Sequence, residues 1–219
     1  MIIVIQCAGS KASNAGTIKH DGQSVSFVAR PHLATPVYGT LFARPDDVIP
    51  GESRTWRDLI LETNANKASQ NGLLQAADLY RHPAYARLKA SIPLTNIFIL
   101  SAGWGLVRGD FRLPDYDITF SSSADSVNRR LESDSGFLDF NQLPNATFEP
   151  GEEIHFFGGS SYLPLFIQMA GSLQCRKVIH FKSEKTRLPE GFDGTQHFGT
   201  ITTNWHYSAL TEFLSRKGT

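Results

Sequence analysis

Short apolar runs alternate with amphipathic segments along this chain. The apolar runs predict strands at residues 1–6, 24–29, 96–100, 153–158 and 177–182, and a last one at 197–202. Apolar residues at helical spacing predict helices at 54–63, 73–91 and 205–215, the second of them divided at Pro83. Strands that alternate with helices in this way are typical of an α/β fold. We therefore predict a mostly parallel central sheet that is flanked by helices and carries loop insertions.

Three of the predicted strands stop abruptly in small and polar residues. They run into the segments CAGSK, SAGWG and GGSSY. In open α/β sheets, ligands bind outside the carboxyl ends of the strands, where small residues let the backbone approach closely. We therefore predict that the three loops line one shared pocket. The expected substrate-binding residues are Cys7, Ser10, Lys11, Ser101, Gly103, Trp104, Gly105, Tyr116, Gly158, Gly159, Ser160 and Tyr162.

Two carboxylates surround a tyrosine after the second of these loops. In an extended segment, Asp115 and Asp117 lie on one face and Tyr116 on the other, so both carboxylates can share a site and one can hold a raised pKa. A carboxylate in such a site stabilises positive charge or activates water. We take Asp117 as the first catalytic candidate, Asp115 as the second and Asp110 as a third. The alternative is that one of them caps a helix or pairs with Arg108 or Arg112.

Flat side chains for stacking and basic side chains for phosphates complete the predicted site. Trp104 lies between two glycines in a loop and is the best stacking candidate, whereas the other aromatic residues, taken singly, are more often core. The sequence assigns no histidine to Cys7 as a base, so we place Cys7 in the pocket wall rather than as a nucleophile. Arg129 and Arg130 form a short basic group that is expected to bind DNA phosphates.

Length and composition favour one domain. The chain has 219 residues, 41% of them hydrophobic, which is enough for a full core. We predict a single α/β domain over residues 1–219 with insertions near 12–75 and 121–150. Within the first insertion, residues 30–53 hold four prolines and are expected to form a long loop or an insertion. Basic and acidic residues number 21 each, so local patches must supply any contact with nucleic acid.

Cysteine and histidine residues indicate neither a disulfide framework nor a metal site. Cys7 and Cys175 are the two cysteines, and the seven histidines show no zinc spacing, so we expect no metal and no cofactor. No run approaches the roughly 18 apolar residues of a membrane helix, and the first residues have the pattern of a strand. These features favour a cytoplasmic protein with no membrane contact, and they leave the oligomeric state open.

Four motifs occur in an order that resembles one known superfamily. CAGSK follows the first strand, LYRHPAYARLKA lies in a central helix, ILSAGWGLVRGDFRLPDYDITF comes in the middle and FFGGSSYLPLF comes late. This order resembles the superfamily of the peroxide-stress protein YaaA and its relatives over residues 1–12 and 76–170. The chain departs from the family pattern at Asp115, where relatives often have a proline, and in the insertion at 12–75.

The resemblance implies a link to nucleic acid and modified bases, closest in kind to phage-defence DNA glycosylases that remove glucosylated hydroxymethylcytosine. We therefore expect a DNA glycosylase that hydrolyses an N-glycosidic bond in double-stranded phage DNA and leaves abasic sites. Breaking that bond builds positive charge on the sugar, which a carboxylate such as Asp117 can stabilise. Two alternatives stay open: a non-catalytic DNA-binding stress protein of YaaA type, and a transferase or hydrolase acting on a free nucleotide or deazapurine.

Overall fold

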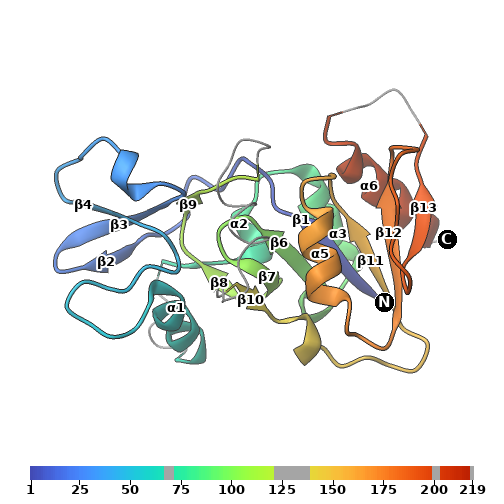
Figure 1. The fold of residues 1–219 in the computed structure, drawn as a ribbon, viewed down its shortest axis with the longest axis horizontal. Helices are drawn as coiled ribbons and strands as arrows, with labels where there is room; N and C mark the ends of the chain where they lie inside the picture. Colours follow the sequence, from blue (N-terminus) through green and yellow to red (C-terminus); the bar gives the residue numbers. More distant parts are fainter. Residues whose placement is uncertain (67–71, 121–138, 199–202, 218–219) are drawn as a thin grey trace.

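A seven-stranded sheet forms the centre of the molecule (Figure 1). The computed structural model describes residues 1–66, 72–120, 139–198 and 203–217. In spatial order the strands are β10 (Phe140–Asn141), β7 (Gly105–Arg108), β6 (Ile97–Ser101), β1 (Ile2–Gln6), β11 (Glu153–Phe157), β12 (Arg176–Phe181) and β13 (Asp193–Gln196). The five strands from β6 to β13 run parallel, and β7 is antiparallel to β6. The predicted α/β class with a mostly parallel sheet is confirmed.

The predicted and observed strands differ most at the end of the sheet. The last strand occupies residues 193–196, ahead of the range 197–202 in which it was expected, and residues 199–202 lie outside the described ranges. β13 has the sequence DGTQ and is largely exposed at the sheet edge. A polar edge strand has no apolar run, so hydrophobic periodicity does not mark it.

The helices follow the amphipathic segments of the sequence. They are α1 (Trp56–Ala65), α2 (Ala76–Leu79), α3 (Pro83–Ser91), α5 (Leu163–Ala170) and α6 (Trp205–Lys217), with short 3-10 helices η1 (Pro31–Leu33), η3 (Leu94–Asn96) and η4 (Leu143–Asn145). α1 begins with a capping box, in which Thr55 and Asp58 each bond the other's backbone N–H. Pro83 starts α3, which confirms the predicted division of the segment 73–91.

Helices cover both faces of the central sheet. The ring of Phe166 from α5 stacks on Phe156 of β11, with ring centroids 4.3 Å apart. The ring of Phe213 from α6 contacts His155 of the same strand at 4.5 Å. Because successive side chains of a strand alternate, Phe156 and His155 point to opposite faces. α5 and α6 therefore lie on opposite faces, and α3 packs beside α6.

A smaller sheet projects at one end of the long axis of the molecule (Figure 1). Its strands are β2 (Ile18–His20), β3 (Gln23–Val28), β4 (Thr40–Ala43) and β9 (Tyr116–Asp117), and a separate pair joins β5 (Leu74–Gln75) to β8 (Arg112–Leu113). Both η1 and β4 fall inside residues 30–53, so this segment is not one long loop without secondary structure. β4 forms because it pairs in parallel with β3, a contact that local composition does not encode.

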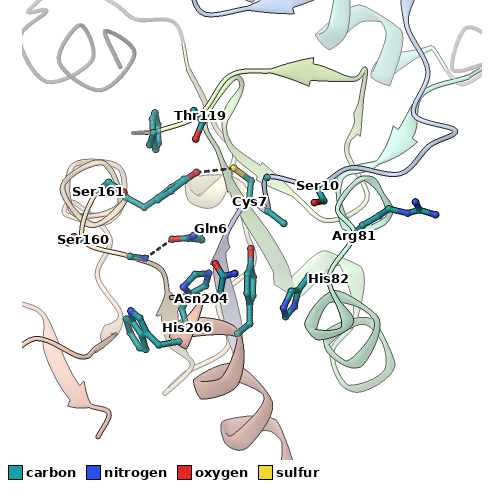
Figure 2. A pocket seen from close by; sticks show the side chains of 17 residues that line it. Gln6, Cys7, Ser10, Arg81, His82, Thr119, Ser160, Ser161, Asn204 and His206 are labelled. Atoms are coloured by element: carbon teal, nitrogen blue, oxygen red, sulfur yellow. Dashed lines mark hydrogen bonds between the residues drawn. The ribbon is translucent and has the colours of Figure 1, made fainter. Parts of the chain in front are cut away.

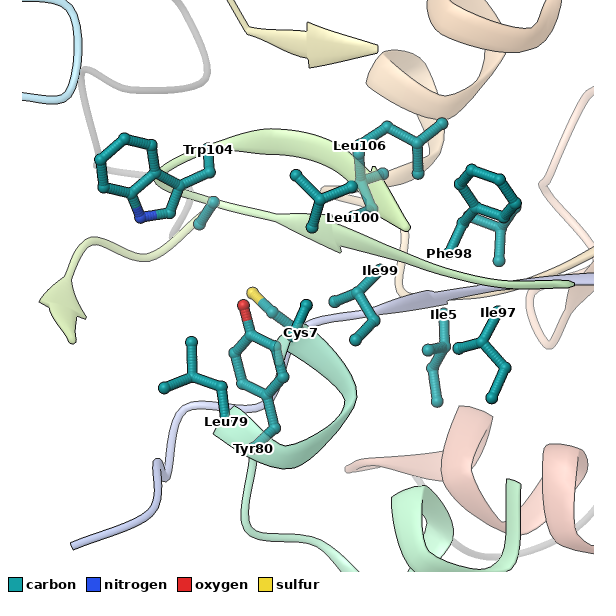
Figure 3. Close-up of a cluster of buried hydrophobic side chains, with 14 of the residues drawn as sticks. Ile5, Cys7, Leu79, Tyr80, Ile97, Phe98, Ile99, Leu100, Trp104 and Leu106 are labelled. Atoms are coloured by element: carbon teal, nitrogen blue, oxygen red, sulfur yellow. The ribbon is translucent and has the colours of Figure 1, made fainter. Parts of the chain in front are cut away.

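The apolar core is continuous across the central sheet. Figure 3 shows its strands β1 and β6, whose side chains Ile5, Ile97, Phe98 and Leu100 are fully buried. A strand that is buried on both faces appears in the sequence as an unbroken run of apolar residues. The positions of β1 and β6 were therefore predicted from the sequence. No helix within the described ranges is long and apolar enough to cross a membrane.

Candidate functional site

The three loops rich in small residues follow neighbouring strands. β1 pairs in parallel with β6 on one side and with β11 on the other. The carboxyl ends of the three strands therefore point the same way, as the strand-end pattern predicted. Only the first and third loops, however, open into a common cavity.

A cavity of about 600 Å³ opens beside those two loops (Figure 2). This volume lies in the range of sites that enclose a small-molecule ligand. Five separate segments supply its described lining. They are Gln6–Ser10 after β1, Arg81 and His82 before α3, Thr119 and Phe120 after β9, Gly159–Tyr162 after β11, and Asn204–Tyr207 at the start of α6. Among the predicted substrate-binding residues, those in this lining are Cys7, Ser10, Gly159, Ser160 and Tyr162.

Two hydrogen bonds join the loops after β1 and β11, and both are dashed in Figure 2. The side-chain oxygen of Gln6 accepts from the backbone N–H of Gly159 at 2.6 Å. The sulfur of Cys7 lies 3.2 Å from the hydroxyl oxygen of Tyr162. Burial raises the pKa of the Tyr162 phenol well above its usual range, so this hydroxyl keeps its proton at neutral pH. The two bonds fix the spacing of the loops on this side of the cavity.

The opposite wall comes from α3 and α6, which the sequence did not assign to the site. His82 stacks on Tyr207 with ring centroids 3.9 Å apart, and His206 packs against the same ring at 4.1 Å. Asn204 precedes α6 with φ of 58°, a left-handed conformation that Asn tolerates better than most residues. The available signal was the clustering of polar and aromatic residues in the segment NWHY, at the start of a predicted helix.

The described lining of the cavity contains one cationic side chain, the guanidinium of Arg81, and no carboxylate. Burial, with a smaller contribution from His82, lowers the pKa of His206 to about 4, and burial lowers the pKa of His82 as well. Both imidazoles are therefore neutral at physiological pH, and each combines one donor with one acceptor. The Nε2 atom of His206 is buried and has no hydrogen-bond partner among the described residues.

The middle loop is part of the core, not of the cavity. Trp104, which Figure 3 draws at the end of the loop after β6, is fully buried. Its ring lies 5.0 Å from that of Phe27 and 6.3 Å from that of Phe140. The prediction that Trp104 stacks on a ligand is therefore wrong. The physical reason is the buried guanidinium of Arg57, which donates to the carbonyl oxygens of Gly103 and Trp104 at 2.9 and 3.0 Å. These bonds satisfy the loop backbone and let it pack inside the protein.

Three further predicted contact residues form an interior cluster. The Ser101 hydroxyl donates to the hydroxyl of Tyr116 at 2.9 Å, and that oxygen lies 2.7 Å from the hydroxyl of Tyr80. The Lys11 ammonium lies 4.1 Å above the ring of Tyr116. Burial raises the pKa values of Tyr80 and Tyr116 well above their usual range. Ser101, Tyr116 and Lys11 do not line the cavity, which corrects their predicted role as ligand contacts.

Three predicted glycines serve close packing. Gly105 has φ of +85°, and a Cβ added there would lie 2.5 Å from the carbonyl oxygen of Phe140. A Cβ on Gly103 would lie 3.0 Å from the ring of Tyr116. Gly158 lines a smaller neighbouring cavity of about 240 Å³ instead of the main one. Glycine is needed at these positions for internal contacts. None of the three lines the main cavity, which corrects the prediction that a ligand there approaches their backbone.

The two candidate carboxylates lie outside the cavity lining, four and two residues before Thr119. Asp115 and Asp117 are exposed while Tyr116 between them is buried, which is the alternation expected of an extended segment. Thr119, two residues beyond Asp117, is exposed and lines the cavity. The carboxylate of Asp115 accepts a hydrogen bond from the N–H of Tyr116 at 2.8 Å.

The other candidate residues separate into two groups. Asp110 is ion-paired with Arg108 at 2.6 Å, as the alternative interpretation of this segment proposed. Arg129 and Arg130 lie outside the described residues. Within the described ranges, no group of three or more histidine, cysteine or acidic side chains is placed to hold a metal ion.

The fold and the cavity define an α/β protein with a polar cavity at the carboxyl ends of parallel strands. A scan against protein-family models gives no match, and a search of curated proteins finds no relative. The resemblance to the YaaA superfamily therefore rests on the sequence motifs alone.

Proposed function

We propose that the chain is a DNA glycosylase that excises a modified base, glucosylated hydroxymethylcytosine in kind, from phage DNA. The observation that carries the proposal is the polar cavity of about 600 Å³ at the carboxyl ends of β1 and β11. A base must leave the duplex before an enzyme acts on it, so such an enzyme needs a pocket that receives the extruded nucleotide.

The groups in the lining suit a nucleotide. Hydroxyl groups of Ser10, Ser160 and Thr119 and neutral imidazoles on the opposite wall supply donors and acceptors for a base edge or a sugar. Arg81 supplies a cation for a phosphate. The lining residues described contain no carboxylate that would repel the phosphate.

Hydrolysis of the glycosidic bond requires a group that stabilises positive charge on the sugar. Water adds to C1′ of the deoxyribose, the bond from C1′ to the base nitrogen breaks, and the base leaves with a proton. We assign the stabilising and water-activating role to Asp117. Its carboxylate is exposed and precedes Thr119 by two residues on the same side of the extended segment.

The cellular setting is part of the proposal. Both cysteines are free thiols in the structure, which suits a reducing compartment. We propose that the protein acts in the cytoplasm on double-stranded DNA that carries modified bases, and that the abasic sites it leaves serve antiviral defence.

A second candidate is a transferase or hydrolase acting on a free nucleotide or deazapurine. The observation that favours it is that Arg81 is the one cationic side chain of the described lining, which is sufficient for a single phosphate group. Such an enzyme would need the cavity but no extended DNA contact.

One experiment separates the two candidates. The protein is incubated with phage DNA containing plain, hydroxymethylated or glucosylated cytosine, and abasic sites are measured by alkaline cleavage while released bases are identified by mass spectrometry. Abasic sites in the modified DNA alone support the glycosylase. Base release from free nucleotides, with every DNA left intact, supports the second candidate instead.

A further inference from the structure

Three histidines and a glutamate form a continuous series of hydrogen bonds across β11, β12 and the end of β13. The Oε2 atom of Glu153 lies 3.0 Å from Nε2 of His155, and Nδ1 of His155 lies 3.1 Å from Nε2 of His180. Nδ1 of His180 lies in turn 2.8 Å from Nε2 of His197. None of these four residues belongs to the described lining of the main cavity, so this histidine series is separate from the proposed site.

The histidine series runs from the amino ends of the strands to their carboxyl ends. Glu153 is the first residue of β11, and His180 lies opposite Phe157, the last residue of that strand. His197 directly follows β13, and its ring lies 5.9 Å from that of Trp205, which lines the cavity. One end of the series therefore lies at the far side of the sheet, and the other lies beside the cavity wall.

Charge fixes the direction of every bond in the series. Arg176 donates to Oε1 of Glu153, and this hydrogen bond lowers the pKa of the carboxyl group, which is therefore ionised at neutral pH and only accepts. Burial lowers the pKa values of His155, His180 and His197, so each imidazole is neutral and combines one donor with one acceptor. Each of the three Nε2 atoms must therefore carry the proton and donate toward Glu153.

The other charges that act on the series come from α6. Lys217 opposes a positive charge on His155. At His197, Glu212 favours such a charge and Arg216 opposes it. Glu212 and Arg216 are ion-paired with each other at 2.5 Å, so their effects on the imidazole oppose one another at close range. The carboxylate that hydrogen-bonds the series is therefore the one at its far end.

We propose that the histidine series is a proton relay between the cavity side of the sheet and its opposite side. A proton from water binds Nδ1 of His197, which is partly exposed, and the Nε2 proton of that ring moves to Nδ1 of His180. The Nε2 proton of His180 moves to Nδ1 of His155, and the Nε2 proton of His155 moves to Oε2 of Glu153. Every hydrogen bond survives with its direction reversed, and the added proton is held on Glu153.

The variant Glu153→Gln tests the relay, because its amide imitates a protonated Glu153. Arg176 keeps the amide oxygen as its acceptor, so the amide nitrogen faces His155 and donates to it. Each imidazole of the series must then accept at Nε2 and carry its proton on Nδ1. Nitrogen NMR of isotope-labelled protein at pH 7.5 distinguishes the two tautomers. We expect Nε2–H on all three rings of the wild type and Nδ1–H on all three rings of the variant.

Two further variants show whether the change passes along the bonds. Glu212→Gln removes a carboxylate that acts on His197 through its charge, and it should leave all three tautomers as in the wild type. His180→Phe interrupts the series at its centre, while a phenyl ring retains the stacking of the buried imidazole. In this background, Glu153→Gln should still change the tautomer of His155 but should leave the signals of His197 unchanged.

Three outcomes overturn the relay. A wild-type protein with Nδ1–H on any of the three rings at pH 7.5 removes it without any substitution. A Glu153→Gln protein in which His155 alone changes tautomer shows that the bonds do not transmit the change. A response of His197 to Glu153→Gln that persists in the His180→Phe background assigns the effect to charge or to a shift of the fold. The spectra need no base excision, so the relay and the glycosylase fail separately.

Discussion

The side-chain oxygen of Gln6 accepts a hydrogen bond from the backbone N–H of Gly159, and this bond joins the ends of β1 and β11. Both residues line the cavity. The shape of the site therefore depends on a contact between segments that are 153 residues apart in the chain.

Replacement of Gln6 by Leu is expected to lower base excision while the protein still folds. The lost bond costs about 0.5–1.5 kcal/mol of stability, which thermal unfolding measures. Gln6→Glu keeps an acceptor for the Gly159 N–H and is expected to retain more activity. Gln174→Leu is the control, because Gln174 makes an exposed 3.3 Å bond to Ser172. Equal activity of Gln6→Leu and this control would show that the loop spacing has no role in excision.

Substitution of Asp117 by Asn is expected to reduce excision at least about a hundredfold, because a neutral amide neither stabilises a sugar cation nor activates water. DNA binding and the unfolding midpoint stay near wild type, since the side chain is exposed. Asp115→Asn is the matched control from the same side of the segment. Excision that is unchanged by Asp117→Asn and abolished by Asp115→Asn would move the catalytic role to Asp115.

Trp104→Ala is expected to act on stability, since the side chain is fully buried. Removal of a large buried aromatic side chain costs about 3–5 kcal/mol, which chemical denaturation measures. Trp205→Ala is the comparison, because Trp205 is partly exposed and lines the cavity. A Trp104→Ala protein with wild-type stability and weakened ligand binding would restore the stacking role for Trp104.

Acid is expected to destabilise the fold through its buried histidines. Burial lowers the pKa of His206 from 6.5 to about 4 and that of His180 to about 3. Above about pH 6.5 both groups are neutral in the folded and unfolded states. As the pH falls below that value, the unfolded chain binds protons that the folded protein excludes, so stability is lost progressively toward pH 4 and 3.

The variant His206→Phe tests this pH dependence. It removes a group whose Nε2 has no hydrogen-bond partner among the described residues. Relative to its own stability at pH 7.5, the variant should lose about 3 kcal/mol less than the wild type on transfer to pH 4. Denaturation midpoints at pH 7.5, 5.5 and 4.0 provide the comparison, and parallel curves for both proteins would contradict it.

The central sheet was predictable because its strands are buried on both faces. Ile2–Ile5 and Ile97–Leu100 are unbroken apolar runs, and each ends in small residues where the sheet ends. The first and third loops were therefore assigned correctly to a shared edge. The local pattern of apolar and small residues was therefore sufficient to predict this part of the fold.

The far wall of the cavity was not predictable, because it forms by contacts between distant segments. His82 and Tyr207 stack across 125 positions of sequence, and neither has a motif that marks it as a ligand contact. The prediction that Trp104 stacks on a ligand was wrong for the same reason. The glycines that flank this residue suggest an exposed loop, whereas Arg57, 47 residues earlier, bonds the loop backbone and makes burial possible.

The pairing of β3 with β9 has only two residue pairs, Phe27 with Tyr116 and Val28 with Asp117. A slip of one position along this short ladder would turn every side chain of the DYDITF segment to the opposite side. The Tyr116 phenol would then face water, and the Asp117 carboxylate would enter an apolar interior at a high desolvation cost. The buried hydrogen bond between Tyr116 and Tyr80 therefore stabilises the register in which the carboxylates of this segment face solvent.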